Sequence, residues 1–305
     1  MSILCAAAFI ATAWAGQVWE NRDGPDGTIR KRFWDRIAPY RDNRPPIPAE
    51  DTVIGGRDVT LWRPIAAGAA PVVFFSPGLG SCATQSAFLT SALAEAGYLV
   101  IAPRHADAGC ATPRQTPPPH PEPSFGLPPV WSDTTWHDRR EDIAAIWEAL
   151  RHDPVFADRI DRSKLAVMGH SVGGYVALGL AGAWPGWRMP EVRAVLALSP
   201  SCAPFLTPDG GLATLSAPVG FQGGTRDVSI TPMLTRRGGC FDRIRGPAHL
   251  VVFRHADHYA WTDPRPRARE AMIAYALAFL DTHLRGAPPE ALSRRRHGVT
   301  LLWNK

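Results

Sequence analysis

A serine between glycines, in "LAVMGHSVGG" at 165–174, is the first residue pattern that could carry chemistry. The apolar residues before Ser171 predict a buried strand, and the small residues after it predict a closely packed helix. Gly169 and Gly173 complete the pattern G-x-S-x-G, which between a strand and a helix presents the serine on a sharp turn. The alternative is a small residue in an ordinary tight turn. We expect a nucleophile, because a helix N-terminus favours the negative charge that develops on an attacked carbonyl oxygen.

A nucleophilic serine needs a base and an acid that orients the base. When the serine stands between a strand and a helix, the acid and then the histidine follow later strands. Asp227 comes just after the apolar run 218–222 and is the expected acid, although it could instead cap the helix that follows. Asp209 and Asp242 fit less well, since neither directly follows a strand.

Two histidines in "VVFRHADHYAWTD" are candidates for the base. His255 continues the last apolar strand, whereas His258 lies in the loop beyond it and is the expected base. The two histidines could instead bind a metal together with Asp257. The serine machinery already accounts for this loop, so we expect no metal ion and no organic cofactor.

The negative oxygen formed by attack on a carbonyl needs two hydrogen-bond donors. One is expected to be the backbone N–H of Val172, directly after the nucleophile. The other is expected in "SPGLGS" (76–81), where glycines at 78 and 80 let the chain turn inward and present the N–H of Leu79. An ordinary Pro-Gly turn is the alternative for this segment.

Apolar runs and helical stripes alternate along the chain and must position these residues. Near-continuous apolar strands between amphipathic helices predict an α/β domain with a mostly parallel sheet covered on both faces. One or two antiparallel strands are expected in 53–63. The expected strands are 72–76, 98–103, 164–170, 194–200, 218–224 and 248–256, and the expected helices lie near 84–96, 143–150, 173–184 and 273–284.

The remaining segments divide the chain as follows. Residues 1–15, ending in Ala-Trp-Ala, resemble a signal peptide, and 16–52 form an irregular lead-in. The α/β domain spans 53–286, and 112–131, with eight prolines in twenty residues, is a lid or a disordered excursion. Residues 287–305 are expected to be a basic C-terminal tail, in which the run "RRRH" at 294–297 is solvated, with a docking site as the alternative.

Composition limits the class of partner. The net charge of +5 comes from dispersed residues, without the basic stripe of a nucleic-acid-binding protein. The apolar stretch at 3–14 is too short to span a bilayer, so no stable membrane insertion is expected. A small molecule is the expected partner, and the oligomeric state is open.

Cysteine usage favours export. Apart from Cys5, four cysteines follow strands at one edge of the expected sheet, which favours the pairs Cys82–Cys110 and Cys202–Cys240. Four unpaired thiols in a cytoplasmic protein are the alternative. With the signal peptide, the pairs predict a secreted or periplasmic protein.

Residues 55–285 resemble the α/β-hydrolase superfamily. Within it, "FFSPGLGS", "WHDRREDIAAIWEAL" leading to "GHSVGG", and "HADHYAW" are similar to the branch of predicted dienelactone hydrolases and platelet-activating-factor acetylhydrolases. Pro77 stands where that branch commonly has histidine. No carboxylate lies near "LALSPS", where the acetylhydrolases carry their acid, and Ser171 stands where true dienelactone hydrolases use cysteine.

The resemblance implies ester hydrolysis without fixing the substrate. Acyl transfer to an alcohol or amine, or amide hydrolysis, would use the same Ser171, His258 and Asp227. A non-catalytic binding protein on the same fold is a further alternative. Trp131, Trp136 and Phe205 are available to line a pocket at the expected active edge.

Overall fold

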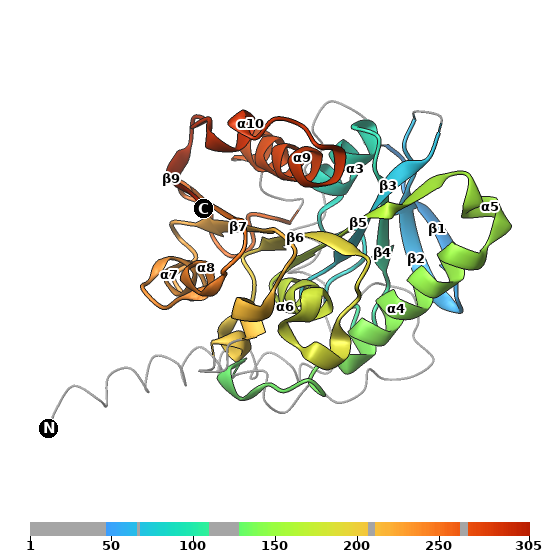
Figure 1. Ribbon diagram of the computed structural model, residues 1–305, viewed down its shortest axis with the longest axis horizontal. Coiled ribbons are helices and arrows are strands. Elements are labelled where there is room, and N and C mark those ends of the chain that lie inside the picture. Colours follow the sequence, from blue (N-terminus) through green and yellow to red (C-terminus); the bar gives the residue numbers. More distant parts are fainter. Residues whose placement is uncertain (1–46, 66–67, 110–127, 207–210, 263–267) are drawn as a thin grey trace, which may run out of the picture.

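A single mixed sheet organises the computed structural model, which describes residues 47–65, 68–109, 128–206, 211–262 and 268–305. Within these residues the strand order is β1-β2-β4-β3-β5-β6-β7-β8-β9 (Figure 1). The pairs from β4 through β8 are parallel, whereas β1/β2, β2/β4 and β8/β9 are antiparallel. The strands are β1 Glu50–Ile54, β2 Arg57–Trp62, β3 Ala70–Ser76, β4 Leu99–Pro103, β5 Ile160–His170, β6 Val192–Leu198, β7 Val219–Gly224, β8 Ala248–Phe253 and β9 Val299–Asn304.

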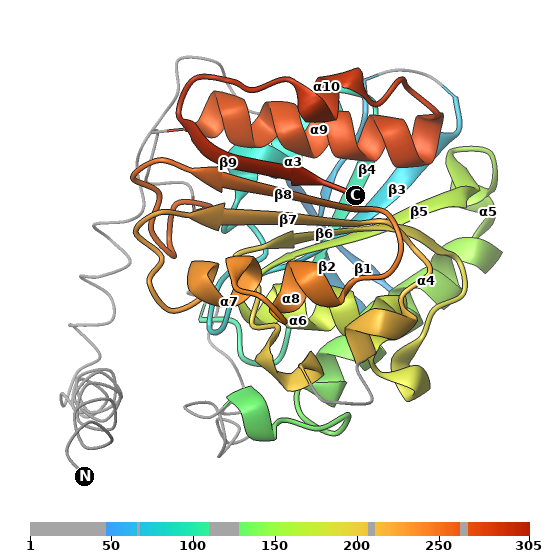
Figure 2. The ribbon, with the colours of Figure 1, turned by 60° about the vertical axis from the view of Figure 1, so that its left-hand side comes forward.

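Helices cover both faces of the sheet, with α3 and α9 on one face and α4 and α6 on the other (Figures 1 and 2). The α-helices are α3 Ala87–Glu95, α4 His137–His152, α5 Pro154–Ala157, α6 Val172–Leu178, α7 Thr231–Thr235, α8 Cys240–Arg243, α9 Arg269–Arg285 and α10 Glu290–Ser293. The shorter turns are η1 Pro128–Val130, η2 Gly179–Ala183, η3 Pro185–Trp187, η4 Ala203–Phe205 and η5 Gly211–Thr214. The predicted α/β class, with a mostly parallel sheet covered on both faces, is confirmed.

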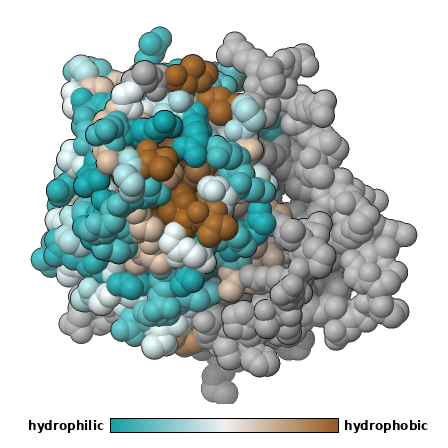
Figure 3. Space-filling view, turned by 90° about the vertical axis from the view of Figure 1, so that its right-hand side faces the viewer, coloured by the Kyte–Doolittle hydropathy of each residue, from teal (hydrophilic) through white to brown (hydrophobic). Residues whose placement is uncertain are grey.

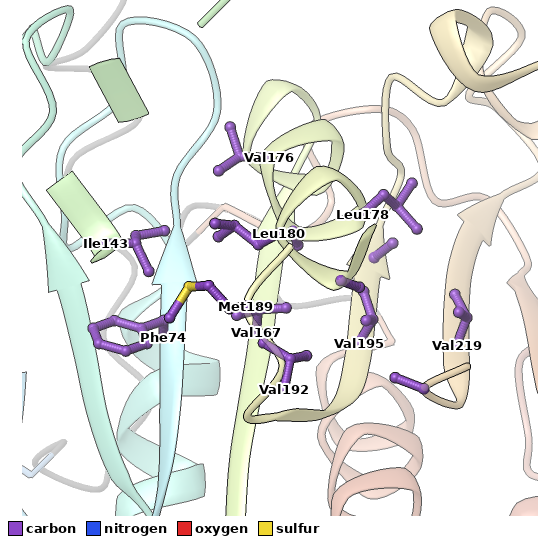
Figure 4. Close-up of a cluster of buried hydrophobic side chains, with 14 of the residues drawn as sticks. Phe74, Ile143, Val167, Val176, Leu178, Leu180, Met189, Val192, Val195 and Val219 are labelled. Carbon is purple, nitrogen blue, oxygen red and sulfur yellow. The ribbon is translucent and has the colours of Figure 1, made fainter. Parts of the chain in front are cut away.

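Side chains of the central strands alternate between two apolar layers, as the two-residue repeat of a strand requires. In β3, Val72 and Phe74 face α4 and α6, whereas Val73 and Phe75 face α3 and α9. Figure 4 shows the first layer, in which Phe74 lies near Ile143 of α4. Because β3 is apolar on both sides, its one polar residue, Ser76, lies at the end of the strand.

The two crossovers that flank β3 run on opposite faces of the sheet. The chain passes from β3 through α3 to β4 on one side of β3, and then through α4 to β5 on its other side. The carboxyl ends of β3 and β5 therefore lie together, with Ser76 beside Gly169. Open parallel sheets bind ligands at such a switch point.

The two ends of the domain differ from the expected boundaries. β1 begins at Glu50, inside the expected lead-in, and pairs with β2. The run "RRRH" at 294–297 is exposed as expected, but the interpretation of 287–305 as a tail was wrong for its last residues, because Val299–Asn304 pairs with β8 as an edge strand. Val299 is buried, whereas Trp303 is 38% exposed. A half-exposed strand of this kind has a weak apolar signal, which explains the error.

Charged side chains mark the opposite edge of the sheet. Glu50 and Asp51 of β1 form ion pairs with Arg63 and Arg104. Figure 3 shows a small apolar patch in mostly hydrophilic surroundings on this side of the molecule. Charges on an edge strand oppose pairing with a further strand.

A disulfide bond joins Cys202, after β6, to Cys240 at the start of α8. Cys82 is also disulfide-bonded, and its expected partner Cys110 lies outside the described residues. Disulfides form in oxidising compartments, so the bond is compatible with a secreted protein. The expected signal peptide and most of the proline-rich segment, up to residue 127, also lie outside the described residues.

Replacing Cys202 and Cys240 together with serine is expected to lower the free energy of unfolding by about 2–4 kcal/mol, because the disulfide restricts the unfolded chain. The bond spans 38 residues of sequence, long enough for that restriction to matter. Urea denaturation measures the change. Equal unfolding free energies for the variant and the wild type would contradict the expectation.

Candidate active site

Ser171 occupies a strained turn between β5 and α6. Its backbone lies at φ 55° and ψ −116°, a positive φ that side chains rarely adopt. Such strain persists only where the surrounding structure imposes it. Here the Ser171 N–H donates to the Leu198 carbonyl at 3.0 Å, and the Ser201 N–H donates to the Ser171 carbonyl at 3.0 Å. Contacts from the end of β6 therefore hold the turn on both sides of the serine.

Glycines around this turn allow backbone to pack directly on backbone. A Cβ on Gly173 would lie 1.8 Å from the Ser76 carbonyl oxygen, and one on Gly169 would lie 2.1 Å from the Gly173 carbonyl oxygen. A Cβ on Gly174 would lie 2.5 Å from the Cβ of Pro200. The first turn of α6 is thus pressed between the ends of β3, β5 and β6.

Three side chains from separate strand ends meet in one hydrogen-bonded row. Ser171 Oγ lies 3.0 Å from His258 Nε2, and His258 Nδ1 lies 3.0 Å from Asp227 Oδ2. Ser171 follows β5, Asp227 follows β7 and His258 follows β8. The structure therefore brings together the three residues that the sequence singled out.

The Asp227 carboxylate is 2% exposed and has several further donors. It accepts hydrogen bonds from the Ser199 hydroxyl, from the Ser229 hydroxyl at 3.1 Å and from the Ile230 N–H at 3.3 Å. Burial alone would raise the pKa of Asp227, but the hydrogen bond and charge of His258, with the Ser199 and Ile230 donors, hold its pKa below the ordinary value. The carboxylate is therefore ionised at neutral pH.

Ser199 is a member of the site that the sequence did not reveal. It directly follows β6, has φ 44°, and its Oγ lies 3.2 Å from His258 Nδ1 as well as bonding Asp227. A serine after an apolar strand gives no distinctive pattern. Only the neighbouring positions of β6 and β7 in the sheet place Ser199 beside Asp227.

The competing candidates lie elsewhere. His255 is exposed and makes no side-chain hydrogen bond to the described residues, and Asp242 accepts from the Gly238 N–H beside α8. Asp209 lies outside the described residues. Asp257 caps the Tyr259 N–H, and no group of three or more metal-ligating side chains occurs in the described part of the chain.

In the loop after β3, the Leu79 N–H lies between two backbone donors that are already used. The Gly78 N–H donates to Gln85 Oε1 at 2.7 Å, and the Gly80 N–H donates to Asp107 Oδ2 at 2.7 Å. The N–H groups of Leu79 and Val172 have no hydrogen-bond partner among the described residues. These two are the donors expected for an oxyanion.

A chain of hydrogen bonds links this loop to the loop of His258. Gln85 Nε2–H donates to His170 Nδ1 at 2.8 Å, and His170 Nε2–H donates to the His258 carbonyl at 2.7 Å. Burial, aided by the neighbouring His258, lowers the pKa of His170 to about 3. A neutral His170 can accept at one nitrogen and donate from the other, as this chain requires.

A second Ser–His–Asp row lies in the interior. Ser76 Oγ is 3.0 Å from His105 Nε2, and His105 Nδ1 is 2.8 Å from Asp142 Oδ2. Ser76 is 1% exposed and His105 is fully buried. No sequence pattern indicates this row, because its members lie on β3, after β4 and on α4.

The three aromatic residues that are available to line a pocket at the active edge are buried in the structure. Trp131 and Phe205 pack on Tyr175 of α6, with ring centroids 5.0 Å and 5.1 Å away, and Trp136 contacts Trp131. Trp131 and Trp136 are each 4% exposed, and Phe205 is 1% exposed. They pack around α6 beneath the turn, and their burial leaves little of these side chains to line a pocket.

Comparison with known proteins does not assign the chain to a family. No protein-family model matches it, and no curated protein sequence matches it. Among the helices of the described residues, none combines the length and the apolar character needed to cross a membrane.

Gly173→Ala is expected to lower the free energy of unfolding by about 1–3 kcal/mol or more, since the new methyl group meets the rigid Ser76 carbonyl. Gly186→Ala is the matched control, because a Cβ there meets nothing within 4 Å. Chemical denaturation compares the two variants. Equal stability of Gly173→Ala and Gly186→Ala would show that α6 does not pack this tightly.

Lowering the pH from about 6.5 is expected to destabilise the protein through His170. An unfolded histidine takes up a proton in this range, whereas folded His170 stays neutral until pH approaches about 3, so stability is lost as pH falls. Each such proton contributes a slope of up to about 1.4 kcal/mol per pH unit.

Denaturation curves between pH 5 and pH 7 would measure this slope for wild type, His170→Gln and the exposed control His255→Gln. The slope is expected to decrease in His170→Gln alone. The same slope in all three proteins would contradict the conclusion that His170 stays neutral in the folded protein and links the two loops.

Proposed function

We propose that this chain is a serine hydrolase of the α/β-hydrolase fold that cleaves carboxylic esters through an acyl-enzyme. The observation that carries the proposal is the hydrogen-bonded row of Ser171, His258 and Asp227. These residues lie beyond the carboxyl ends of β5, β8 and β7, respectively. The strained turn between strand and helix supports it, because this geometry presents a nucleophilic serine.

In the first half-reaction, His258 Nε2 takes the hydroxyl proton as Ser171 Oγ attacks the ester carbonyl carbon. The C=O electron pair moves onto oxygen and gives a tetrahedral intermediate. As it collapses, the bond to the alcohol oxygen breaks and His258 returns its proton to the leaving alcohol. The acyl group is then bound to Ser171 as an ester.

The negative oxygen of the intermediate would be held by the N–H groups of Leu79 and Val172. Val172 opens α6, so the partial positive charge of the helix N-terminus acts in the same direction as its N–H. Asp227 accepts from His258 Nδ1, which selects the tautomer that leaves Nε2 free as a base and stabilises the imidazolium.

Water completes the cycle. His258 takes a proton from water, whose oxygen attacks the acyl carbon, and a second tetrahedral intermediate forms. Its collapse breaks the bond to Ser171, which regains a proton from His258, and releases the carboxylic acid. The residues need no metal ion or organic cofactor for any of these steps.

Incubation with a fluorophosphonate, followed by intact-protein mass spectrometry, tests the proposal. We expect one adduct on the wild type, at Ser171, and none on Ser171→Ala or His258→Ala. Hydrolysis of short-chain p-nitrophenyl esters should fall about 10⁴-fold in kcat for Asp227→Asn, because the histidine loses its correct tautomer.

His255→Ala is the matched control, since this exposed histidine is only three positions from the proposed base. It should keep both labelling and hydrolysis. A folded wild type without adduct or ester hydrolysis would exclude the proposed function, and loss of activity in His255→Ala alone would transfer the role of base to that residue.

A further inference from the structure

Arg139 of α4 places its guanidinium group beneath the loop that follows β3. Its side chain is completely buried. Nη1 donates to the Pro77 carbonyl at 2.6 Å, and Nη2 donates to the Gly78 carbonyl at 3.1 Å. Nε and Nη2 also donate to the two oxygens of Asp107, at 3.1 Å and 2.7 Å. A buried charge with so many partners constrains whatever it contacts.

The contact with Gly78 bears on the proposed oxyanion donor through the peptide group itself. The Gly78 carbonyl and the Leu79 N–H belong to one planar peptide unit, and its trans geometry points them in opposite directions. A guanidinium that fixes the carbonyl therefore also fixes the direction of the N–H. The hydrogen bond polarises the peptide, which strengthens the N–H as a donor.

Asp107 holds the next peptide unit. Its Oδ2 accepts from the Gly80 N–H, so the peptides on both sides of Leu79 are fixed by one ion pair. Burial alone would raise the pKa of Asp107, but the charge and hydrogen bonds of Arg139 keep that pKa below its ordinary value. The carboxylate therefore stays charged and holds the Arg139 guanidinium in place.

We infer that Arg139, supported by Asp107, is a positioning residue that aims the Leu79 N–H at the oxyanion. This inference rests on the proposed ester hydrolysis. Arg139 contacts the peptide group of the donor and is not placed in contact with substrate. Its contribution should therefore be realised mainly in the transition state, when the carbonyl oxygen becomes negative.

Arg139→Lys is the test, because lysine keeps the charge but lacks the planar fork that binds Asp107 and the loop carbonyls together. Loss of one oxyanion donor costs about 10²–10³ in kcat, so a misaligned donor should lower kcat by about 10- to 100-fold. KM should stay near the wild-type value, since the ground-state ester gains little from the donor.

An alkyl boronic acid provides a second readout. Ser171 Oγ adds to boron, the hydroxyl proton passes to His258, and the boron becomes tetrahedral and negatively charged. Its inhibition constant should rise in Arg139→Lys by about the factor that kcat loses, because both depend on transition-state-like contacts. A purely structural role would not make these two quantities change together.

Arg151→Lys is the matched control, since Arg151 is an ion-paired arginine on the same helix that does not contact the loop. Asp107→Asn is the second variant, to be used if Arg139→Lys does not fold, and it should also lower kcat at constant KM. Each variant is assayed below its own thermal unfolding range.

The outcomes separate the two proposals. A wild type without hydrolysis or fluorophosphonate labelling overturns the proposed function and this inference with it. Suppose instead that the wild type is active and that the folded Arg139→Lys variant, or Asp107→Asn in its place, keeps the wild-type kcat and inhibition constant for the boronic acid. That result overturns only the inference. A variant that is less stable than the wild type, or that has a higher KM, but keeps the wild-type kcat also overturns the inference.

Discussion

The positive-φ turn at Ser171 is the constraint on which the rest of the site depends. A residue with φ 55° between a strand and a helix brings the first turn of α6 back against the strand ends, where Gly173 meets the backbone at Ser76. Local propensity opposes this conformation. It is stable because β3, β5 and β6 supply close-packed backbone on three sides, and the aromatic rings around Tyr175 fix α6 from below.

The same constraint explains why so many polar groups are buried at this edge. Once α6 lies this close, the loops around it are shut away from water, and their N–H and C=O groups need partners within the protein. Gln85 and His170 satisfy one such set, and Arg139 and Asp107 satisfy another. Ser199 does the same for Asp227. Stability and pre-organisation of the site therefore have a common origin.

Much of this arrangement could be predicted from sequence, because its main signals are local. Strands of β-branched residues are visible as short apolar runs. Ser171 stands directly after one of them, and Asp227 and His258 lie in the loops that follow two others. The parallel sheet then brings their ends together without any further assumption. Expectations that rested on one strand and the residues next to it agree with the structure.

Long-range partners could not be predicted in this way. Arg139 looks like an ordinary polar residue of an amphipathic helix, because its partner Asp107 is 32 positions away. Strand β9 was missed for a related reason: its pairing with β8, rather than its own half-exposed sequence, makes it a strand. In both cases the decisive contact joins two segments, and the sequence pattern of neither segment indicates that contact.

The two Ser–His–Asp rows show that residue type and distance do not by themselves define a catalytic site. Ser76 ends an extended strand and is 1% exposed, and its hydroxyl oxygen accepts a hydrogen bond from Arg139 Nη1 at 3.3 Å. Burial and the charge of Arg139 lower the pKa of His105, which opposes the imidazolium that a general base must form. Ser171 differs in the respects on which its proposed role as a nucleophile depends, since it is partly exposed, stands at a helix N-terminus and is followed by an N–H with no partner among the described residues. The interior row is better explained as a support, because through Ser76 and Arg139 it joins the loop that presents Leu79.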